Sequence, residues 1–428
     1  MPSSNKLAPF QPHFRKTTLA LFLALLCGCN QAETTENTPA QSAIGTVENS
    51  GASCSVNELA PYEALADISE LPDPFLGLNG ERITHQQQWR CRRAEIAAQF
   101  QHYELGVKPP KPESVNASIK DNVLTIEVEH EGKHIAFDAP IIYPSTGSAP
   151  YPLMIGVGRS SLNQEALDKL GIALVNFPNN DVGEQQNGSS RGKGKFFELY
   201  GSDHSASALT AWAWGISRLI DGLAQVPEAK IDNAHIGVTG CSRNGKGAIV
   251  AGAFDERIAL TIPQESGSGG AASWRVSEAQ QVDGQNVQTL KQIVTENVWL
   301  TESFKQFSYT VDKVPVDHHE LMAMVAPRGL LVIENTSMEW LGNVSAQTTA
   351  VVAQHIYQAL GAGDNMGASQ VGGHNHCQYP DAQLPELNAY LQKFLLGNDS
   401  INTQVMHSDG DFKIDLDRWM PWESTYLK

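Results

Sequence analysis

The stretch Val238-Thr-Gly-Cys-Ser-Arg-Asn-Gly-Lys-Gly-Ala248 decides the fold of this 428-residue chain. The apolar run Ile236–Thr239 predicts a strand, and the small residues after Arg243 predict a helix, with Ser242 at the turn between them. This order is typical of a nucleophile elbow, in which a serine occupies a strained turn and small neighbours let the strand and the helix approach closely. Ser242 is therefore the candidate nucleophile.

Two details of this stretch depart from common motifs. Gly240 fits the elbow pattern, but Asn244 stands where a second glycine is usual. Asparagine tolerates unusual backbone angles better than most residues, so we expect it to replace that glycine. Gly245 and Lys246 also approach the phosphate-binding P-loop pattern, but Gly247 stands where that loop needs Ser or Thr. We therefore favour the elbow.

The rest of the chain alternates predicted strands and helices. Strands are expected at 123–128, 135–143, 153–157, 172–177, 236–239, 258–262 and 329–334, and helices at 205–223, from about 243, 346–360 and 384–396. Such alternation indicates βαβ units and a parallel sheet covered on both faces. We predict an α/β-hydrolase fold: a three-layer αβα sandwich with a mostly parallel central sheet.

A serine nucleophile needs a histidine base and a carboxylate that orients the histidine. Glu265 follows the strand after the nucleophile strand, at the carboxyl end where sheet enzymes place their chemistry. Glu334 and Glu339 follow a later strand and offer a rival position for the acid. His374 and His376 are the candidate bases, and their spacing alone does not choose between them.

The cysteines help with this choice. Four of the six lie beyond the N-terminal segment: Cys54, Cys91, Cys241 and Cys377. Three pairings into two disulfides are possible from sequence alone. A bridge between Cys241 and Cys377 would hold Ser242 beside His376, which favours His376 as the base. Cys54 would then pair with Cys91.

No metal, cofactor or nucleic acid is expected. The cysteines lack the paired spacing of a zinc site, and adjacent His318 and His319 are interpreted as packing residues rather than ligands. With 30 basic and 47 acidic side chains, the formal net charge is −17, which argues against phosphate-backbone binding.

The N-terminus resembles an export signal. Residues 1–28 combine basic residues with a short apolar run, and Leu26-Cys-Gly-Cys29 resembles a bacterial lipoprotein cleavage site, with an ordinary cleaved signal as the alternative. Cys29 would carry the lipid, and this lipid would be the only attachment of the chain to the membrane. We expect a flexible linker over 29–53 and one catalytic domain over 54–428. The expected location is the outer membrane, and otherwise secretion.

Several segments together resemble the glucuronoyl esterases, carbohydrate esterase family 15. The similar segments are 191–201, 211–218, 240–248, 263–267 and 374–377, and the resemblance covers nearly everything from Cys54 onward. It implies hydrolysis, without a metal, of the ester between (4-O-methyl-)glucuronic acid on xylan and a lignin alcohol. The expected partner is this lignin–carbohydrate substrate, and the enzyme is expected to be a monomer.

The resemblance also implies roles for individual residues. Ser242 is the nucleophile, His376 the base and Glu265 the acid, with Glu339 as the alternative acid. Arg243 is expected in the oxyanion hole, through its backbone N–H and its guanidinium. The positions that match glucuronate-binding residues are Lys246, Gln288, Glu296 and Trp340. The cysteine pair beside the triad also matches, whereas Ser273 replaces a cysteine that fungal members often use in a further bridge.

Two other functions are compatible with these residues. A serine esterase of different specificity, for acetyl xylan or feruloyl esters, would use the same triad. A carbohydrate-binding protein that has kept the fold without catalysis is disfavoured by the intact serine, histidine and acid set.

Overall fold

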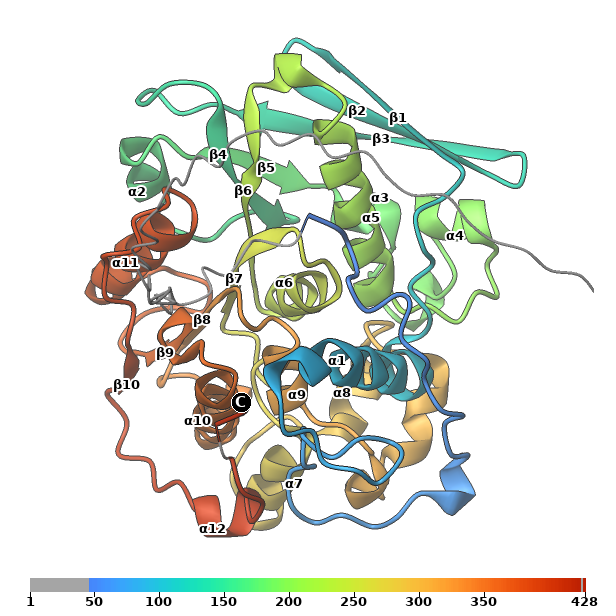
Figure 1. The fold of residues 1–428 in the computed structure, drawn as a ribbon, viewed down its shortest axis with the longest axis vertical. Helices are drawn as coiled ribbons and strands as arrows, with labels where there is room; N and C mark the ends of the chain where they lie inside the picture. The colour runs from blue at the N-terminus through green and yellow to red at the C-terminus, as the bar shows by residue number, and fades with distance from the viewer. Residues whose placement is uncertain (1–45, 425) are drawn as a thin grey trace, which may run out of the picture. The chain divides into compact units, whose positions relative to one another are not determined.

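A mostly parallel sheet runs through the domain in the computed structural model, which describes residues 46–424 and 426–428. Its strands lie in the order β1-β2-β3-β5-β4-β6-β7-β8-β9-β10 (Figure 1). Pairing is antiparallel from β1 through β3 to β5 and parallel in every later pair. The strands are β1 (Ser114–Lys120), β2 (Val123–His130), β3 (Lys133–Ile142), β4 (Tyr151–Val157), β5 (Ala173–Phe177), β6 (Ile231–Cys241), β7 (Ile258–Gln264), β8 (Gly329–Glu334), β9 (Met366–Gln370) and β10 (Met406–Ser408).

Helices cover both faces of this sheet. The helices are α1 (Gln86–Phe100), α2 (Gln164–Lys169), α3 (Asn179–Val182), α4 (Lys195–Tyr200), α5 (Ala208–Leu223), α6 (Arg243–Phe254), α7 (Trp274–Val282), α8 (Leu290–Glu296), α9 (His318–Ala323), α10 (Asn343–Ala359), α11 (Leu384–Phe394) and α12 (Leu416–Trp419). Buried apolar side chains of α5, α6 and α10 belong to one cluster. Those of α2 and α11 pack with strand residues in a second cluster. The predicted three-layer sandwich is confirmed.

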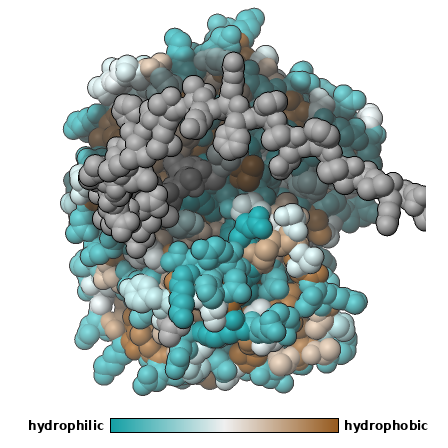
Figure 2. All heavy atoms as spheres, in the orientation of Figure 1, coloured by the Kyte–Doolittle hydropathy of each residue, from teal (hydrophilic) through white to brown (hydrophobic). Residues whose placement is uncertain are grey.

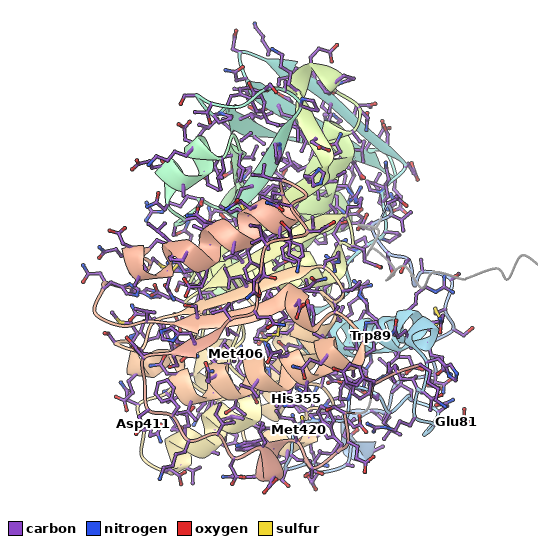
Figure 3. All side chains as sticks on the ribbon, turned by 60° about the vertical axis from the view of Figure 1, so that its left-hand side comes forward. Glu81, Trp89, His355, Met406, Asp411 and Met420 are labelled. Carbon is purple, nitrogen blue, oxygen red and sulfur yellow. A yellow bond between two sulfur atoms is a disulfide. The ribbon has the colours of Figure 1, made fainter. Side chains whose placement is uncertain are left out.

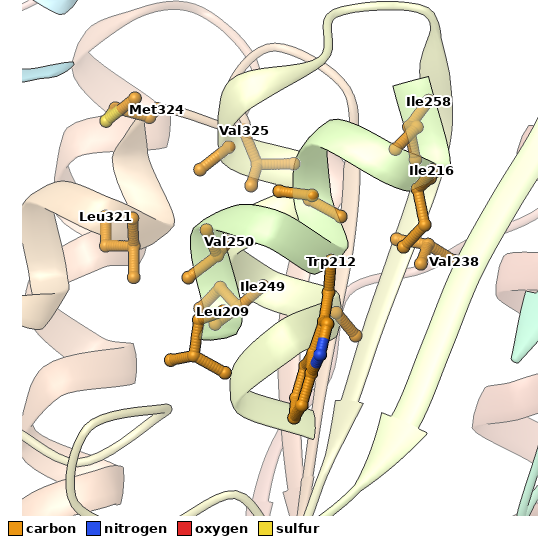
Figure 4. Packing of buried hydrophobic residues seen from close by; sticks show 14 of the residues in the cluster. Leu209, Trp212, Ile216, Val238, Ile249, Val250, Ile258, Leu321, Met324 and Val325 are labelled. Carbon is orange, nitrogen blue, oxygen red and sulfur yellow. The ribbon is translucent and has the colours of Figure 1, made fainter. Parts of the chain in front are cut away.

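The layer beside the nucleophile strand is closely packed because α5 and α6 approach each other. Trp212 and Ile216 of α5 lie beside Ile249 and Val250 of α6 in the buried cluster (Figure 4). A Cβ on Gly247 would lie 2.8 Å from the Trp212 ring, so a glycine is needed at this crossing. The packing fixes the helix that begins directly after Ser242.

The predicted strands and helices are all present, within a few residues at their ends. The predicted hairpin appears as β2 and β3, and the predicted helix near Arg243 appears as α6. The elements that were not predicted are strands β1, β9 and β10 and helices α1, α2, α3, α4, α7, α8, α9 and α12. Trp89 of α1 and Met406 of β10 mark two of these elements in Figure 3.

The N-terminal boundary differs from the expectation. Residues 46–53 belong to the predicted linker, but Glu48 lies in a partly buried cluster of charged side chains with Lys108 and Arg218. The Ser50 backbone N–H donates to Glu256 at 2.7 Å. Folded structure therefore extends to at least residue 46 instead of beginning at 54, because this short segment finds buried charged partners.

The predicted signal over 1–28, the lipidated Cys29 and the linker up to residue 45 lie outside the described residues. Among the helices that are described, none combines the length and the apolar character needed to cross a bilayer. Hydrophilic residues predominate over the coloured surface of the face shown in Figure 2, in keeping with the many acidic side chains.

Candidate active site

Ser242 stands at a strained turn between β6 and α6. Its backbone angles are φ 59° and ψ −128°, a region that residues with a Cβ rarely adopt. The Ser242 N–H donates to the carbonyl of Gln264 at 2.9 Å, which ties the turn to the neighbouring strand β7. The side chain is half-buried at the carboxyl end of the sheet, the geometry expected of a nucleophile elbow.

The small residues around Ser242 are required by close backbone contacts. A Cβ on Gly240 would lie 2.3 Å from the carbonyl oxygen of Asn244, and a Cβ on Gly245 would lie 2.8 Å from that of Gln264. Asn244 itself does not have a positive φ, so our explanation of its presence by backbone tolerance was wrong. It sits in the first turn of α6, and its Oδ1 accepts a hydrogen bond from Asn179 at 3.1 Å.

Glu265 and His376, the predicted acid and base, lie in direct contact. The carboxylate of Glu265 is fully buried, and its Oε2 lies 2.7 Å from Nδ1 of His376. The same oxygen accepts the backbone N–H of Cys377 at 3.0 Å. A carboxylate bonded to Nδ1 leaves Nε2 of the imidazole for a nucleophile, as in serine hydrolases. Glu265 has a φ of 46°, so its own backbone turn aims this side chain.

The predicted disulfides are both confirmed. Cys241 and Cys377 are bridged with their Cα atoms 5.7 Å apart, and they are the chain neighbours of Ser242 and His376. Cys54 and Cys91 form the second bridge. The sulfur atoms of Cys241 and Cys377 each lie within 4.8 Å of a ring nitrogen of His376, so the bridge lies beside this histidine.

The rival acid and base residues lie in other environments. Glu339 is exposed, and its Oε1 accepts the backbone N–H of Asn286 at 3.3 Å. The Nε2 atom of His374 lies 2.9 Å from the carbonyl of Val371, and its Nδ1 lies 3.8 Å from Glu265, too far for a hydrogen bond. The geometry thus joins His376 with Glu265 rather than His374 or Glu339.

Glu334 lies beside the acid without contacting the base. It is fully buried, and its Oε1 accepts the N–H of Ser266 at 2.9 Å. Burial, followed by the nearby charge of Glu265, raises the pKa of Glu334 to about 8. Such a carboxyl group is largely protonated at neutral pH, so it braces the loop after β7 instead of acting as a second carboxylate.

His318 and His319 are packing residues in α9, as expected. His318 lies between the carbonyl of Gly270, at 2.6 Å from Nδ1, and the carboxylate of Glu104, at 3.0 Å from Nε2. Nε2 of His319 lies 2.8 Å from the carbonyl of Pro72. Within the described part of the chain, the one group with metal-like spacing is Cys241, His376 and Cys377, whose two sulfurs are already bonded together.

The four predicted sugar-binding residues lie near Ser242, His376 and Glu265 and are linked to them through short contacts. The Lys246 ammonium is buried and donates to the carbonyls of Ser266 and Ser268, the latter at 2.6 Å. Burial lowers its pKa to about 8, and nearby Glu334 and Glu296 raise it. Two of its three N–H groups thus have carbonyl acceptors, and the centroid of the Trp299 ring lies 6.0 Å from Nζ.

Gln288, Glu296 and Trp340 form the rim on one side. Nε2 of Gln288 donates to Glu296 at 3.2 Å, and the backbone N–H of Gln288 donates to the carbonyl of Trp340 at 3.1 Å. The Trp340 ring stands edge-on to His376, with ring centroids 4.9 Å apart. An aromatic plane beside amide and carboxylate groups suits a sugar ring, which has both apolar faces and hydroxyls.

Sequence reasoning missed two residues beside Arg243. The exposed guanidinium of Arg243 lies over the Trp299 ring, 5.6 Å from its centroid, and it donates to Oε1 of Gln185 at 3.4 Å. Gln185 lies 57 residues before Ser242 in a loop, and Trp299 lies in an irregular segment after α8. Neither stands in a recognisable motif, so only the folded chain brings them to the site.

Comparison with known proteins gives a consistent result. A family described as glucuronyl esterase, fungi, matches residues 126–361. A 4-O-methyl-glucuronoyl methylesterase from Hypocrea jecorina is 47% identical over 377 residues, covering 88% of this chain and 80% of the relative.

Solved structures agree with the sequence comparison. The glucuronoyl esterase catalytic domain from Hypocrea jecorina aligns with a TM-score of 0.82 and 47% identity, covering 85% of this chain and 99% of that one. A serine-to-alanine mutant of the glucuronoyl esterase from Sporotrichum thermophile, in complex with methyl 4-O-methyl-β-D-glucopyranuronate, aligns with a TM-score of 0.83 and 46% identity. That alignment covers 88% of this chain and 100% of the other.

Proposed function

The chain belongs to the glucuronoyl esterase family and is a carboxylic ester hydrolase, and on this premise we propose that Ser242, His376 and Glu265 are its catalytic triad. The observation that carries this proposal is the 2.7 Å contact between Nδ1 of His376 and the buried carboxylate of Glu265. The bridge between Cys241 and Cys377 supports it further, because it holds the chain neighbours of the serine and the histidine together.

The proposed substrate is an ester of (4-O-methyl-)glucuronic acid, in nature the ester that links this acid on xylan to a lignin alcohol. The relative from Sporotrichum thermophile holds the methyl ester of such an acid, which supports the acyl half of the substrate. The exposed rim at Glu296 and Arg243 leaves the acyl site open to solvent, in keeping with a large polymeric alcohol and sugar chain.

The reaction is a two-step acyl transfer. Nε2 of His376 takes the proton of Ser242 while Oγ attacks the ester carbonyl, and Glu265 stabilises the imidazolium that forms. His376 then donates that proton to the departing alcohol, which leaves a glucuronoyl ester on Ser242. Water attacks this ester with His376 again as the base, and the free acid and the serine are regenerated.

We propose Arg243 as the main source of oxyanion stabilisation. In this fold one donor is the N–H that follows the nucleophile, and another comes from the loop after the neighbouring strand. That loop follows β4, but its N–H groups at Gly158, Arg159 and Ser160 already bond to other protein oxygens. The guanidinium of Arg243 lies beside Ser242 in sequence and supplies the missing donor, with the backbone N–H of Arg243 as the first.

Lys246, Gln288, Glu296 and Trp340 are proposed to hold the glucuronate. The remaining N–H of the Lys246 ammonium would donate to a ring hydroxyl near the acyl group. The hydrogen-bonded pair Gln288 and Glu296 would bind further hydroxyls. Trp340 would offer an apolar face to the ring, and its contact with His376 keeps that face next to the reacting centre.

Activity on benzyl glucuronate tests the function directly. The wild type is expected to release benzyl alcohol, and Ser242→Ala is expected to abolish turnover because no nucleophile remains. Release of acetate from acetyl xylan or of ferulate, without benzyl glucuronate hydrolysis, would instead indicate a different specificity. Full activity of Ser242→Ala would refute the serine mechanism.

The choice of acid has its own test. Glu265→Gln should lower kcat by about 10³-fold or more, because the buried partner of His376 can no longer stabilise an imidazolium. Glu339→Gln should leave kcat within about twofold, as expected for an exposed surface change. The reverse order of effects would transfer the acid role to Glu339.

We also propose that the enzyme is exported and acts as a monomer, either with a lipid on Cys29 at the outer membrane or, after cleavage of an ordinary signal, as a secreted protein. The support is the basic and apolar character of residues 1–28 and the Leu26-Cys-Gly-Cys29 pattern. Fractionation of cells that express the full chain tests it. The wild type should sediment with membranes and Cys29→Ala should not, and equal distribution of the two would rule the anchor out.

A further inference from the structure

The proposed role of Arg243 requires a fixed guanidinium, yet Arg243 is an exposed residue. Arg243 is the first residue of α6, and its side chain reaches into solvent. Ordering a long arginine side chain costs more rotamer entropy than ordering most other side chains. A catalytic donor that had to be ordered in every transition state would lose this free energy, so contacts that hold it beforehand matter.

Two groups hold the guanidinium in the structure. One is the ring of Trp299, whose centroid lies 5.6 Å from Cζ of Arg243. The other is Oε1 of Gln185, which accepts from Nη1 of Arg243 at 3.4 Å. The indole Nε1 of Trp299 donates to this same oxygen at 3.1 Å. A carboxamide oxygen has two acceptor positions, so Gln185 joins the arginine to the ring beneath it.

Gln185 is itself held on both sides of its backbone. Its carbonyl accepts from Nδ2 of Asn297 at 3.0 Å, and its N–H donates to Oδ1 of Asn180 at 3.4 Å. Trp299 is almost fully buried, so packing fixes the ring over which the Arg243 guanidinium lies. The oxygen of Gln185 is therefore a fixed acceptor next to the guanidinium of an exposed arginine.

We infer that Gln185 is a positioning residue that holds the Arg243 guanidinium over Trp299, ready for the oxyanion. The inference rests on the proposed function, because it acts through the oxyanion role of Arg243. An amide suits this task better than a carboxylate. It accepts the hydrogen bond without a negative charge that would compete with the oxyanion for the arginine.

A double-mutant cycle tests the inference in the full-length enzyme. Gln185→Met removes the acceptor and keeps the length of the side chain, and Arg243→Met removes the cation. Benzyl glucuronate hydrolysis is measured for the wild type, both single variants and the double variant, with kcat corrected by titration of Ser242 with a covalent serine probe. Gln186→Ala, an exposed glutamine in the same loop, is the matched control.

Gln185→Met is expected to lower kcat about tenfold, in the range of one hydrogen bond to a charged group, with KM within about twofold. In the Arg243→Met background the same change should alter kcat by less than about twofold, because the group that it positions is gone. Gln186→Ala should match the wild type.

The outcomes separate this inference from the proposed function. Equal fold losses from Gln185→Met in both backgrounds would mean a general structural role and would overturn the inference, while hydrolysis by the wild type still supports the esterase function. Full kcat in Arg243→Met or in Gln185→Met would overturn it as well. A wild type that does not hydrolyse the ester would overturn the proposed function itself.

Discussion

The turn that carries Ser242 requires a residue without a side chain at Gly240. A Cβ at this position would meet the Asn244 carbonyl at 2.3 Å, and that oxygen belongs to the first turn of α6. We expect Gly240→Ala to lower the free energy of unfolding by about 1–3 kcal/mol, as overpacking does, and to lower kcat because Ser242 moves. Urea unfolding and ester hydrolysis measure the two effects.

Gly188 provides the control for this substitution. A Cβ there has nothing within 4 Å and φ is not in the left-handed region. Gly188→Ala should therefore change the free energy of unfolding by no more than about 0.5 kcal/mol. Identical unfolding midpoints for Gly240→Ala and Gly188→Ala would show that the elbow accommodates a methyl group.

Glu334 makes the free energy of unfolding depend on pH between its ordinary pKa of 4.5 and its pKa in the folded protein, about 8. Its folded-state pKa of about 8 lies above the ordinary value of 4.5, so folding takes up a proton between these values. The free energy of unfolding therefore falls as pH rises through this window, by at most about 1.4 kcal/mol per unit. Glu334→Gln cannot titrate, so it should gain stability relative to the wild type from pH 5 to pH 8.

Urea unfolding of both proteins at pH 5, 6, 7 and 8 measures this difference. Glu339→Gln, at an exposed carboxylate, is the control and should follow the wild-type pH dependence. Parallel curves for Glu334→Gln and the wild type would contradict a neutral Glu334 in the folded protein.

At the scale of single residues, the sequence predicted most of the site but not how it is held. Ser242 and the pair of histidines stood in recognisable segments, and the cysteines beside them pointed to His376. Gln185 and Trp299 could not be found, because their contacts with Arg243 join two distant loops to the start of α6 through side chains alone. Local pattern carries no information on such contacts.

At the scale of elements, the end of β6 and the loop after β9 are joined covalently. The bridge between Cys241 and Cys377 closes a separation of 136 residues, and the bridge between Cys54 and Cys91 closes one of 37. Loop-closure entropy then gives about 5 kcal/mol for the first and about 4 kcal/mol for the second. Stability alone should thus hardly distinguish them.

Catalysis should distinguish the two bridges clearly. Replacing both Cys241 and Cys377 by Ala should lower kcat about tenfold or more, because the base is no longer held next to the serine. Replacing both Cys54 and Cys91 should leave kcat of the folded fraction within about twofold. Guanidinium unfolding and kcat normalised to folded enzyme measure these effects, and equal losses of kcat would refute a positioning role for the first bridge.

Two of the missed elements, β9 and α1, bury polar side chains. After Met366, strand β9 consists of small and polar residues that are nonetheless all buried, so it lacks the apolar run expected of a central strand. Helix α1 buries Arg92 and Arg93 against acidic partners and backbone carbonyls, which hides its inner face from an apolar pattern. The other central strands were predictable because their buried residues are apolar.

At the scale of the whole molecule, the ion pairs of Glu48 hold the first described residues against the rest of the domain. Despite burial, which raises it, the pKa of Glu48 is lowered to about 2 by Lys108, Arg218 and Arg257. The lowered pKa means that its contribution to stability is full above about pH 4.5 and is lost as pH falls toward 2. At pH 7 we expect Glu48→Gln to lower the free energy of unfolding by about 3 kcal/mol.

The pH dependence of this substitution is the sharper measurement. The difference between Glu48→Gln and the wild type should shrink steadily below pH 4.5 and vanish below about pH 2, where the wild-type carboxyl also becomes neutral. A difference that stays constant from pH 7 to pH 3 would show that the ion pairs contribute nothing and that only packing was changed.

The bridge between Cys54 and Cys91 also determines how the enzyme bears a mechanical load. A pull on the N-terminal end reaches the Glu48 contacts first and then passes through the disulfide straight into α1. The segment from 55 to 90 lies outside this covalent path, so it carries no tension. A load on the leading end of the chain would therefore enter the domain at a packed helix, and it would not peel the segment from 55 to 90 away from the surface.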